Sequence, residues 1–336
     1  MSGMHNSRDE QPRLSVILPV YHAETTLQRT LNSLFAATEK SLEIVCVNDG
    51  STDASGDILR KAAETDVRVV VLEQENQGVS AARNAALKIC TGKYVIFVDA
   101  DDEVTPDYFS NLLRDAEAHD ADLVVCGYST ALPNGALLQK SFTSEVCTSP
   151  SPNLLASLPV GVCSHLYKRA ALETKNGIAL FPTGIRYGED TAFHYAVYPR
   201  ITKLVISAER GYIIHESPGS ATCRSSELVA DMSLALEWLL SVHGGCEKTE
   251  QLSSFLVLFA SHTLQRIYAL STLSDISANL SKFSSSLLKS GISENCLTCI
   301  STKHASRLRA ILRGNVRPPI SYYFKQFRKK LKSYMR

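Results

Sequence analysis

Three carboxylates stand close together at residues 99–102, where the sequence reads Asp99-Ala100-Asp101-Asp102. They follow the apolar run 94–98, which has the length and composition of a buried β-strand. An open α/β sheet binds its ligands at the carboxyl ends of its strands, and clustered negative charge is unfavourable there unless a cation neutralises it. Hard oxygen ligands suit Mg²⁺ or Mn²⁺, and phosphate oxygens commonly complete the shell of such an ion. We therefore expect Mg²⁺ or Mn²⁺ at this turn, carrying a diphosphate.

Two further loops carry side chains suited to a nucleotide. The first reads Asn48-Asp49-Gly50-Ser51-Thr52-Asp53, whose amide and carboxylate can accept hydrogen bonds from a base or a ribose. These residue types are also common in tight turns and helix N-caps, so this loop taken alone favours a structural role. The second loop, residues 75–84, is typical of a glycine turn into a helix N-terminus that favours an anion. Arg83 would there clamp a diphosphate or pair with an internal carboxylate, and both alternatives stay open.

The first 125 residues alternate apolar strands with amphipathic helices. We expect strands at 14–20, 42–47, 67–72, 94–98 and 122–126, and helices at 25–37, 54–63, 80–89 and from Pro106 onward. This order predicts an α/β fold with a doubly wound, mostly parallel sheet. Residues 129–157 do not continue this alternation of strand and helix patterns. The pattern is helical from 227 to 312, which predicts a helical C-terminal extension.

The bulk composition predicts a folded globular chain, with 44% hydrophobic and 21% charged residues in a length of 336. Residues 1–13 are polar, without the apolar segment of a secretory signal, and the nine cysteines are scattered rather than arranged as a disulfide framework. We therefore expect a cytoplasmic location and reduced thiols. No run of eighteen apolar residues occurs in the sequence, so any membrane contact is expected to be peripheral.

The formal charge of +1 conceals a basic tail. Residues 303–336 hold eleven Lys or Arg and no Asp or Glu, so residues 1–302 carry −10, which is +1 less 11. Within residues 317–336, aromatic and aliphatic residues recur at spacings of three and four, and lysines largely fill the other face. This pattern is typical of an amphipathic helix at an anionic membrane surface, or of a terminal helix packed on its own protein. Nucleic acid is not expected as a partner, because no stacking platform accompanies the charge.

Four segments resemble, in order and spacing, the pattern of the family 2 glycosyltransferases, which are inverting GT-A enzymes that use nucleotide-diphospho sugars. The segments are 15–21, 47–53, 76–84 and 97–102. The resemblance implies that Asp99 and Asp101 form the Asp-x-Asp pair that meets the ribose and the metal, with Asp102 as a helper. It further implies that the nucleoside is contacted by Pro19, Tyr21, Asn48 and Asp49. Arg83 would lie near the nucleoside or its diphosphate.

The resemblance continues into the segments 162–169 and 187–193. In the family, the Asp of the second segment is the catalytic base, which implies that Asp190 is the base here. The alternative is that Glu189 and Asp190 only complement a helix N-terminus. The segment 213–220 resembles one that often carries an Arg before a Pro-Gly-Ser turn, and His215 stands in its place. His215 would assist the departing diphosphate by a hydrogen bond or in its protonated form.

These observations predict a metal-dependent inverting glycosyltransferase of cell-surface polysaccharide biosynthesis. It would move a sugar from a UDP- or GDP-sugar to a hydroxyl of a glycan or a lipid-linked acceptor. A non-catalytic nucleotide-sugar-binding or scaffold protein is one alternative. A sugar nucleotidyltransferase is another, although residues 19–24 lack the glycine-rich, arginine-bearing loop that such an enzyme needs.

The expected organisation has three parts. Residues 1–12 form a disordered N-terminus, and residues 13–222 form the GT-A domain, with a nucleotide half at 13–128 and an acceptor half at 129–222. Residues 223–336 form the helical C-terminal region with the basic amphipathic tail 317–336.

Overall fold

The chain divides into two compact units in the computed structural model. The first unit comprises Met1–Pro150, Pro159–Gly184 and Arg200–Pro218, and the second comprises Ser151–Leu158, Ile185–Pro199 and Gly219–Arg336. The structure describes residues 11–132, 134–174, 177–215, 225–243, 254, 257–261, 263–264, 276–289 and 302–313. Residues 1–10 of the predicted N-terminal segment 1–12, and the whole of the tail 317–336, lie outside these residues.

The first unit begins with three parallel strands and two helices, as the alternating pattern predicts. Strands β1 (Leu14–Val20), β2 (Leu42–Asp49) and β3 (Val69–Gln74) lie side by side in the order β3-β2-β1. Helices α1 (Leu27–Phe35) and α2 (Ser55–Thr65) make the crossovers. Every residue of β1 is buried, because this strand lies inside the sheet and is covered on both faces.

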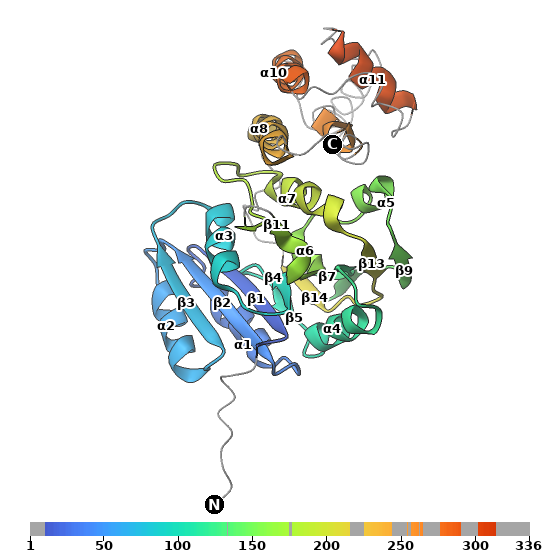
Figure 1. The fold of residues 1–336 in the computed structure, drawn as a ribbon. Helices are drawn as coiled ribbons and strands as arrows, with labels where there is room; N and C mark the ends of the chain where they lie inside the picture. The colour runs from blue at the N-terminus through green and yellow to red at the C-terminus, as the bar shows by residue number, and fades with distance from the viewer. Residues whose placement is uncertain are drawn as a thin grey trace, which may run out of the picture. The chain divides into compact units, whose positions relative to one another are not determined.

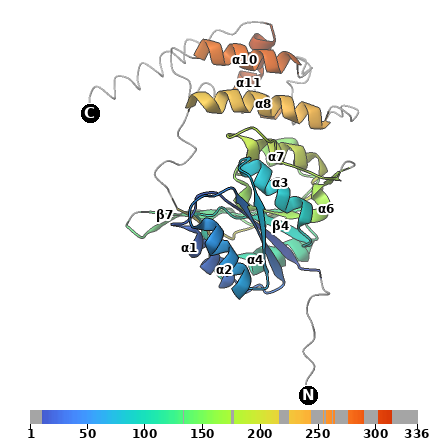
Figure 2. The same ribbon diagram turned by 90° about the vertical axis from the view of Figure 1, so that its left-hand side faces the viewer.

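The order in which successive strands join the sheet reverses at β1, and this switch point is where we expect the candidate site. After α3 (Val79–Ile89), the strand β4 (Tyr94–Phe97) pairs with the free side of β1, with Ile17 opposite Phe97. A right-handed crossover in the opposite direction puts α3 on the other face of the sheet from α1 and α2, and helices flank the sheet on both sides in Figures 1 and 2. The crevice of an open α/β sheet lies at such a switch point, outside the carboxyl ends of the strands.

Among the described residues the main sheet has eight strands and is mixed, with more parallel than antiparallel pairs of strands. Its order is β3-β2-β1-β4-β10-β6-β13-β9. The predicted strand at 122–126 is β6 (Leu123–Val125), and β13 (Lys203–Ile206) runs parallel to it. The strands β10 (His165–Lys168) and β9 (Glu145–Thr148) are antiparallel to their neighbours, and β10 lies between β4 and β6. The prediction of a doubly wound, mostly parallel sheet is confirmed, while the antiparallel insertion of β10 was not foreseen.

A second sheet of four short strands lies in the same unit. Its order is β5 (Glu103–Val104), β14 (Tyr212–His215), β7 (Tyr128–Ala131) and β8 (Leu137–Lys140). The sequence showed no rhythm over 129–157, yet this region contains β7, β8, β9 and the helix α5 (Pro152–Ala156). These strands have only four residues each, and those of β8 are all exposed, so they carry no periodic apolar signal.

Helix α4 (Tyr108–His119) begins two residues later than predicted, because Pro106 precedes the helix instead of opening it. The Pro106 carbonyl accepts a hydrogen bond from the Thr38 amide at 2.8 Å. Short elements complete the described chain: η1 (Val162–Ser164), α6 (Arg169–Leu172), β11 (Glu173–Thr174), β12 (Gly177–Ile178) and η2 (Tyr198–Arg200).

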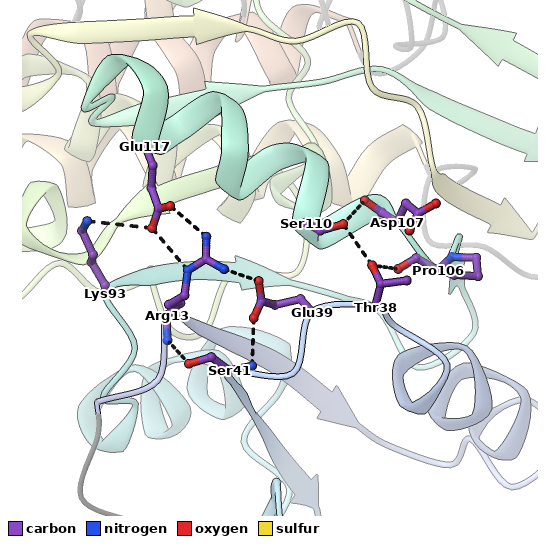
Figure 3. A network of polar contacts seen from close by, with 9 residues as sticks. All are labelled: Arg13, Thr38, Glu39, Ser41, Lys93, Pro106, Asp107, Ser110 and Glu117. Carbon is purple, nitrogen blue, oxygen red and sulfur yellow. Dashed lines mark hydrogen bonds and ion pairs between the residues drawn. The ribbon is translucent and has the colours of Figure 1, made fainter. Parts of the chain in front are cut away.

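A polar network ties α4 to the amino ends of the central strands (Figure 3). The guanidinium of Arg13, just before β1, donates to Glu39 at 2.5 Å and to Glu117 of α4 at 2.8 Å. Lys93, just before β4, lies 4.0 Å from Glu117. Glu39 is buried, whereas Arg13, Lys93 and Glu117 are partly exposed, so the pairs of Glu117 contribute little to stability, about 0–1 kcal/mol for each exposed pair. The network lies at the opposite end of the strands from the acidic turn.

The described part of the second unit is almost entirely helical, which confirms the predicted helical extension. It contains α5, α7 (Glu189–Val197), α8 (Ser225–His243), α10 (Ile276–Lys289) and α11 (Thr302–Leu312). Its interior includes an edge-to-face contact between the Tyr195 and Phe259 rings, 5.4 Å apart. Among the residues that the structure describes, no helix is both long enough and apolar enough to cross a bilayer.

The loop between α3 and β4 permits a sharp packing test. A Cβ atom on Gly92 would lie 2.5 Å from the backbone nitrogen of Ser15 in the central strand β1, which cannot move aside. We expect Gly92→Ala to lower the free energy of unfolding by about 1–3 kcal/mol, the usual cost of overpacking a core. Chemical denaturation measures this change. Gly161→Ala is the matched control, because its φ is −75° and a Cβ there meets no atom within 4 Å. Equal stabilities of the two variants would contradict the packing of this loop.

Candidate functional site

The carboxyl end of β2 holds Asn48 and Asp49 in buried positions. Asn48 donates from its amide nitrogen to Glu73 at 2.6 Å and accepts from the Ser51 amide at 3.1 Å. One oxygen of Asp49 accepts from the side chain of Gln74 and the amide of Gln77, and the other accepts from the amide of Gly78 at 2.8 Å. Asp49 therefore fixes the loop after β3, which leads into α3. The prediction that these two residues contact a nucleoside remains a prediction.

Arg83 pairs with an internal carboxylate, which is one of the two alternatives that the sequence left open. Its guanidinium donates to Asp99 Oδ1 at 3.1 Å and lies 5.2 Å from the centre of the Phe181 ring. The side chain of Arg83 is only 4% exposed, while that of Asp99 is 39% exposed. Next to it on α3, the amide group of Asn84 bonds both the carbonyl and the amide of Phe181. Arg83 is thus a fixed cation behind the acidic turn.

Both carboxylate oxygens of Asp99 have partners within the protein. Asp99 Oδ2 lies 3.3 Å from the thiol of Cys163, and its backbone amide donates to the hydroxyl of Tyr212 at 3.2 Å. Burial raises the pKa of the Cys163 thiol well above its usual range, and the Asp99 charge adds to that effect, so the thiol acts as a neutral donor. Sequence reasoning did not single out Cys163 or Tyr212. Neither residue carries a local signal, since Cys163 reaches the turn from the short helix η1 and Tyr212 from strand β14, both distant in sequence.

Asp102 lies behind the turn and is nearly inaccessible. Its carboxylate accepts from the Tyr212 hydroxyl at 2.7 Å and from the His215 amide at 2.9 Å. Burial, with repulsion from Asp99 as the next cause, raises the pKa of Asp102 to about 7, and these two hydrogen bonds partly oppose that rise. The imidazole Nε2 of His215 lies 2.6 Å from Glu103, because β14 pairs with β5. His215 is therefore beside the acidic turn.

The loop after β1 carries the exposed ring of Tyr21. This ring is 50% exposed and stacks on His22, with the ring centres 4.1 Å apart. His22 adopts a φ of +48° and contacts Thr52 through Nε2 at 3.1 Å, which joins this loop to the one after β2. Pro19 is buried within β1, directly opposite Val47. Tyr21 thus offers an accessible aromatic face on which a base could stack.

Asp190 belongs to the second unit, whereas the other candidate residues belong to the first. It belongs to the first turn of α7, which begins after Gly188 at a φ of +82°. The amides of Arg186 and Tyr187 both donate to one carboxylate oxygen of Asp231 in α8, at 2.9 and 3.1 Å. The predicted helix start is confirmed. The role of Asp190 as a base is not tested by this geometry.

The structure thus brings most of the predicted residues to one edge of the first unit. Asn48 and Asp49 end β2, Asp99 and Asp101 follow β4, and His215 joins them from β14. Asp99 and Asp101 supply hard oxygen donors of the kind that Mg²⁺ and Mn²⁺ take. Among the residues described, no three His, Cys, Asp or Glu side chains form a cluster that could hold a metal ion. The donor set fits an ion that obtains further ligands from phosphate oxygens and water.

Comparison with known proteins identifies the family. Residues 15–157 match the model of glycosyl transferase family 2. The chain is 30% identical over 265 residues to the putative glycosyltransferase EpsH of Bacillus subtilis, and the match covers 75% of this chain and 76% of EpsH. The chain belongs to glycosyl transferase family 2. A second relative, the uncharacterized glycosyltransferase EpsJ of B. subtilis, is 32% identical over 63% of each chain. A third is the poly(ribitol-phosphate) beta-glucosyltransferase of Bacillus spizizenii, 34% identical over 60% of this chain and 32% of that protein.

The fold is also found in solved structures. S. aureus TarS 1–349 in complex with UDP-GlcNAc has a TM-score of 0.73 at 20% identity, covering 90% of this chain and 88% of that one. The mannosyltransferase PcManGT of Pyrobaculum calidifontis, in complex with GDP-Man and Mn²⁺, has a TM-score of 0.54 at 17% identity over 95% and 84% of the chains. These similarities confirm that the chain has a GT-A-type fold. The chain spans about 63% of EpsJ and less of the glucosyltransferase.

The buried Asp102 gives this family member a predictable pH dependence of stability. Its pKa rises from 3.8 in the unfolded chain to about 7 in the folded state, so between these pH values only the folded state holds the proton. The free energy of unfolding should therefore fall as pH rises from about 4 to about 7, by up to about 1.4 kcal/mol per pH unit. We expect Asp102→Asn to flatten this slope, since Asn does not titrate, its oxygen can accept from the His215 amide, and its NH2 group can donate to the Tyr212 oxygen.

Denaturation at a series of pH values, without nucleotide or divalent cation, measures the slope. Asp107→Asn is the control, because Asp107 is an exposed carboxylate that lies outside the acidic turn. It should keep the wild-type slope. A wild-type slope in Asp102→Asn would contradict the assigned protonation.

Proposed function

We propose that the chain is a metal-dependent inverting glycosyltransferase that moves a sugar from a nucleotide-diphospho sugar to a hydroxyl of a cell-surface glycan or its lipid-linked precursor. The observation that carries this proposal is the acidic turn Asp99–Asp102, held beside Arg83 at the switch point of the sheet. Family membership supports glycosyl transfer. The name of the poly(ribitol-phosphate) beta-glucosyltransferase supports an anionic surface polymer as the class of acceptor.

The donor side is assigned to the first unit. We assign the nucleoside to the loops after β1 and β2, where Pro19, Tyr21, Asn48 and Asp49 lie. UDP-GlcNAc in TarS and GDP-Man in PcManGT support a UDP- or GDP-sugar as donor. Arg83 is already paired with Asp99, so it acts on the nucleotide through the orientation of that carboxylate or by direct contact near the diphosphate.

Asp99 and Asp101 are the residues that would hold Mg²⁺ or Mn²⁺. The bound ion would offset the negative charge that develops on the departing diphosphate. The Mn²⁺ in the PcManGT complex supports this assignment. We assign to His215, whose Nε2 lies 2.6 Å from Glu103, the orientation of a phosphate oxygen through its second ring nitrogen.

The transfer is a single displacement. The acceptor oxygen bonds to the anomeric carbon, the bond from that carbon to the diphosphate oxygen breaks, and the electron pair leaves with the diphosphate. Asp190 accepts the hydroxyl proton, and the attack from the face opposite the leaving diphosphate inverts the configuration at the anomeric carbon. We further propose that residues 13–222 form a GT-A domain and residues 223–336 a helical region. We also propose a cytoplasmic location, with peripheral membrane contact through residues 317–336.

Donor binding is tested by thermal shift with a panel of nucleotide sugars, each with Mn²⁺ and with EDTA. We expect one nucleotide class to raise the melting temperature only when Mn²⁺ is present, because the ion links the carboxylates to the diphosphate. A donor at 100 times its dissociation constant should stabilise the fold by about 2.7 kcal/mol. Stabilisation by every nucleotide equally, or by none, would contradict the proposal.

Catalysis is tested with the selected donor, membrane extract as acceptor, and release of nucleoside diphosphate as the readout. We expect Asp190→Asn to lower the rate by at least about a hundredfold, since general bases typically contribute 10²–10⁴-fold. Asp101→Asn should also lower the rate, because it removes a ligand of the ion that would offset the charge on the diphosphate. Asp190→Asn should still show the Mn²⁺-dependent thermal shift, whereas Asp101→Asn should lose it. Asp107→Asn is the control and should keep the wild-type rate. A protein that binds donor but releases no diphosphate would instead be the scaffold alternative.

A further inference from the structure

Helix α1 carries a polar stripe beside its apolar one. Its buried apolar residues Leu27, Leu31 and Leu34 line one side. The polar stripe, centred about a third of the circumference away at 3.6 residues per turn, consists of Thr26, Arg29, Thr30 and Ser33. The first member stands at the N-cap position, and its side chain does not cap the helix.

Each member of the polar stripe bonds the backbone of the acidic turn or of the strand after it. The hydroxyls of Thr26 and Thr30 both donate to the Ala100 carbonyl at 3.0 Å. The guanidinium of Arg29 donates to the Asp101 carbonyl at 2.7 Å. Thr30 Oγ1 also lies 2.7 Å from the Asp102 carbonyl, and Ser33 Oγ accepts from the Val104 amide at 3.2 Å.

These contacts fix both peptide groups that flank Asp101. The Ala100 carbonyl belongs to the peptide before Asp101, and the Asp101 carbonyl belongs to the peptide after it. Since two fixed peptide planes leave the intervening residue little freedom in φ and ψ, the direction of the Asp101 Cα–Cβ bond is set by α1. Helix α1 is itself anchored by its buried leucines.

Thr30 is the central member of the stripe. It is 0% exposed, and its single hydroxyl is shared between two carbonyls. A buried hydroxyl is unfavourable without hydrogen-bond partners, and here the turn supplies both of them. Thr26 also serves Ala100, but no other side chain among the described residues donates to the Asp102 carbonyl.

Arg29 connects the same stripe to the second sheet. Its Nε lies 3.5 Å from the carboxylate of Glu103, which in turn contacts His215 at 2.6 Å. One helix therefore holds the acidic turn and also reaches the residue pair beside it.

We propose that Thr30 is a positioning residue, which orients the Asp101 carboxylate toward a metal-bound nucleoside diphosphate by holding the backbone of the acidic turn. The proposal rests on the proposed function, because it assigns the diphosphate to this turn. Thr30 touches no reacting atom and acts through Asp101.

The test compares Thr30→Val, which is nearly isosteric but lacks the hydroxyl, with Thr30→Ser, which keeps it. Thr25→Val is the matched control, because Thr25 is exposed just before the helix. Calorimetry measures the binding of UDP and of GDP with Mn²⁺ and with EDTA, well below each melting temperature. We expect Thr30→Val to bind the Mn²⁺-loaded nucleotide about tenfold more weakly, the equivalent of one hydrogen bond, with little change in EDTA. Thr30→Ser and Thr25→Val should stay within about twofold of wild type.

Amide hydrogen exchange over residues 100–104 supplies a readout independent of nucleotide. We expect faster exchange in Thr30→Val than in wild type or Thr30→Ser, because the turn loses its anchor. Unchanged exchange overturns the proposal, whatever the nucleotide data show. Faster exchange with unchanged Mn²⁺-dependent affinity also overturns it, since the turn would then be held without consequence for binding. A wild-type protein that binds neither nucleotide refutes the proposed function, and the exchange result alone then decides whether Thr30 holds the turn.

Discussion

The concentration of negative charge at the end of β4 is the constraint on which the rest of the site depends. Asp99, Asp101, Asp102 and Glu103 lie within five residues, and in a partly buried turn their mutual repulsion is costly. This repulsion is offset in a different way at each residue. Arg83 pairs with Asp99, burial favours the protonated form of Asp102, and His215 and Arg29 flank Glu103. The turn keeps its shape because neighbouring elements surround it on several sides.

The topology of the sheet explains why those elements are available. Since the strand order reverses between β1 and β4, helix α1 packs on one side of the turn and α3 supplies Arg83 from the other face. The antiparallel strand β10 and the short helix before it bring Cys163 to Asp99. The small second sheet brings Tyr212 and His215. Each of these segments is far from residue 100 in sequence, so the turn is a meeting point of long-range contacts.

The carboxyl end of β2 shows how a motif can organise the neighbouring loops through hydrogen bonds within the protein. Asp49 uses both oxygens to hold the loop after β3, and Asn48 is bonded to Glu73. Such internal bonds give the loops a single arrangement, which lowers the entropy lost when a ligand binds. The exposed ring of Tyr21 stands beside this rigid frame, so recognition by these loops combines one accessible aromatic surface with preorganised neighbours.

The sequence by itself determined the strands β1 to β4, the acidic turn after β4 and the start of α7, because each depends on local periodicity or on residues adjacent in the chain. It also determined the family, through four segments in order. Only the tertiary structure decided that Arg83 pairs with Asp99, that Asp102 is buried beneath Tyr212, and that the stripe on α1 holds the turn. These are contacts between residues 16 to 110 positions apart, and no local pattern encodes which distant donor will meet a given acceptor.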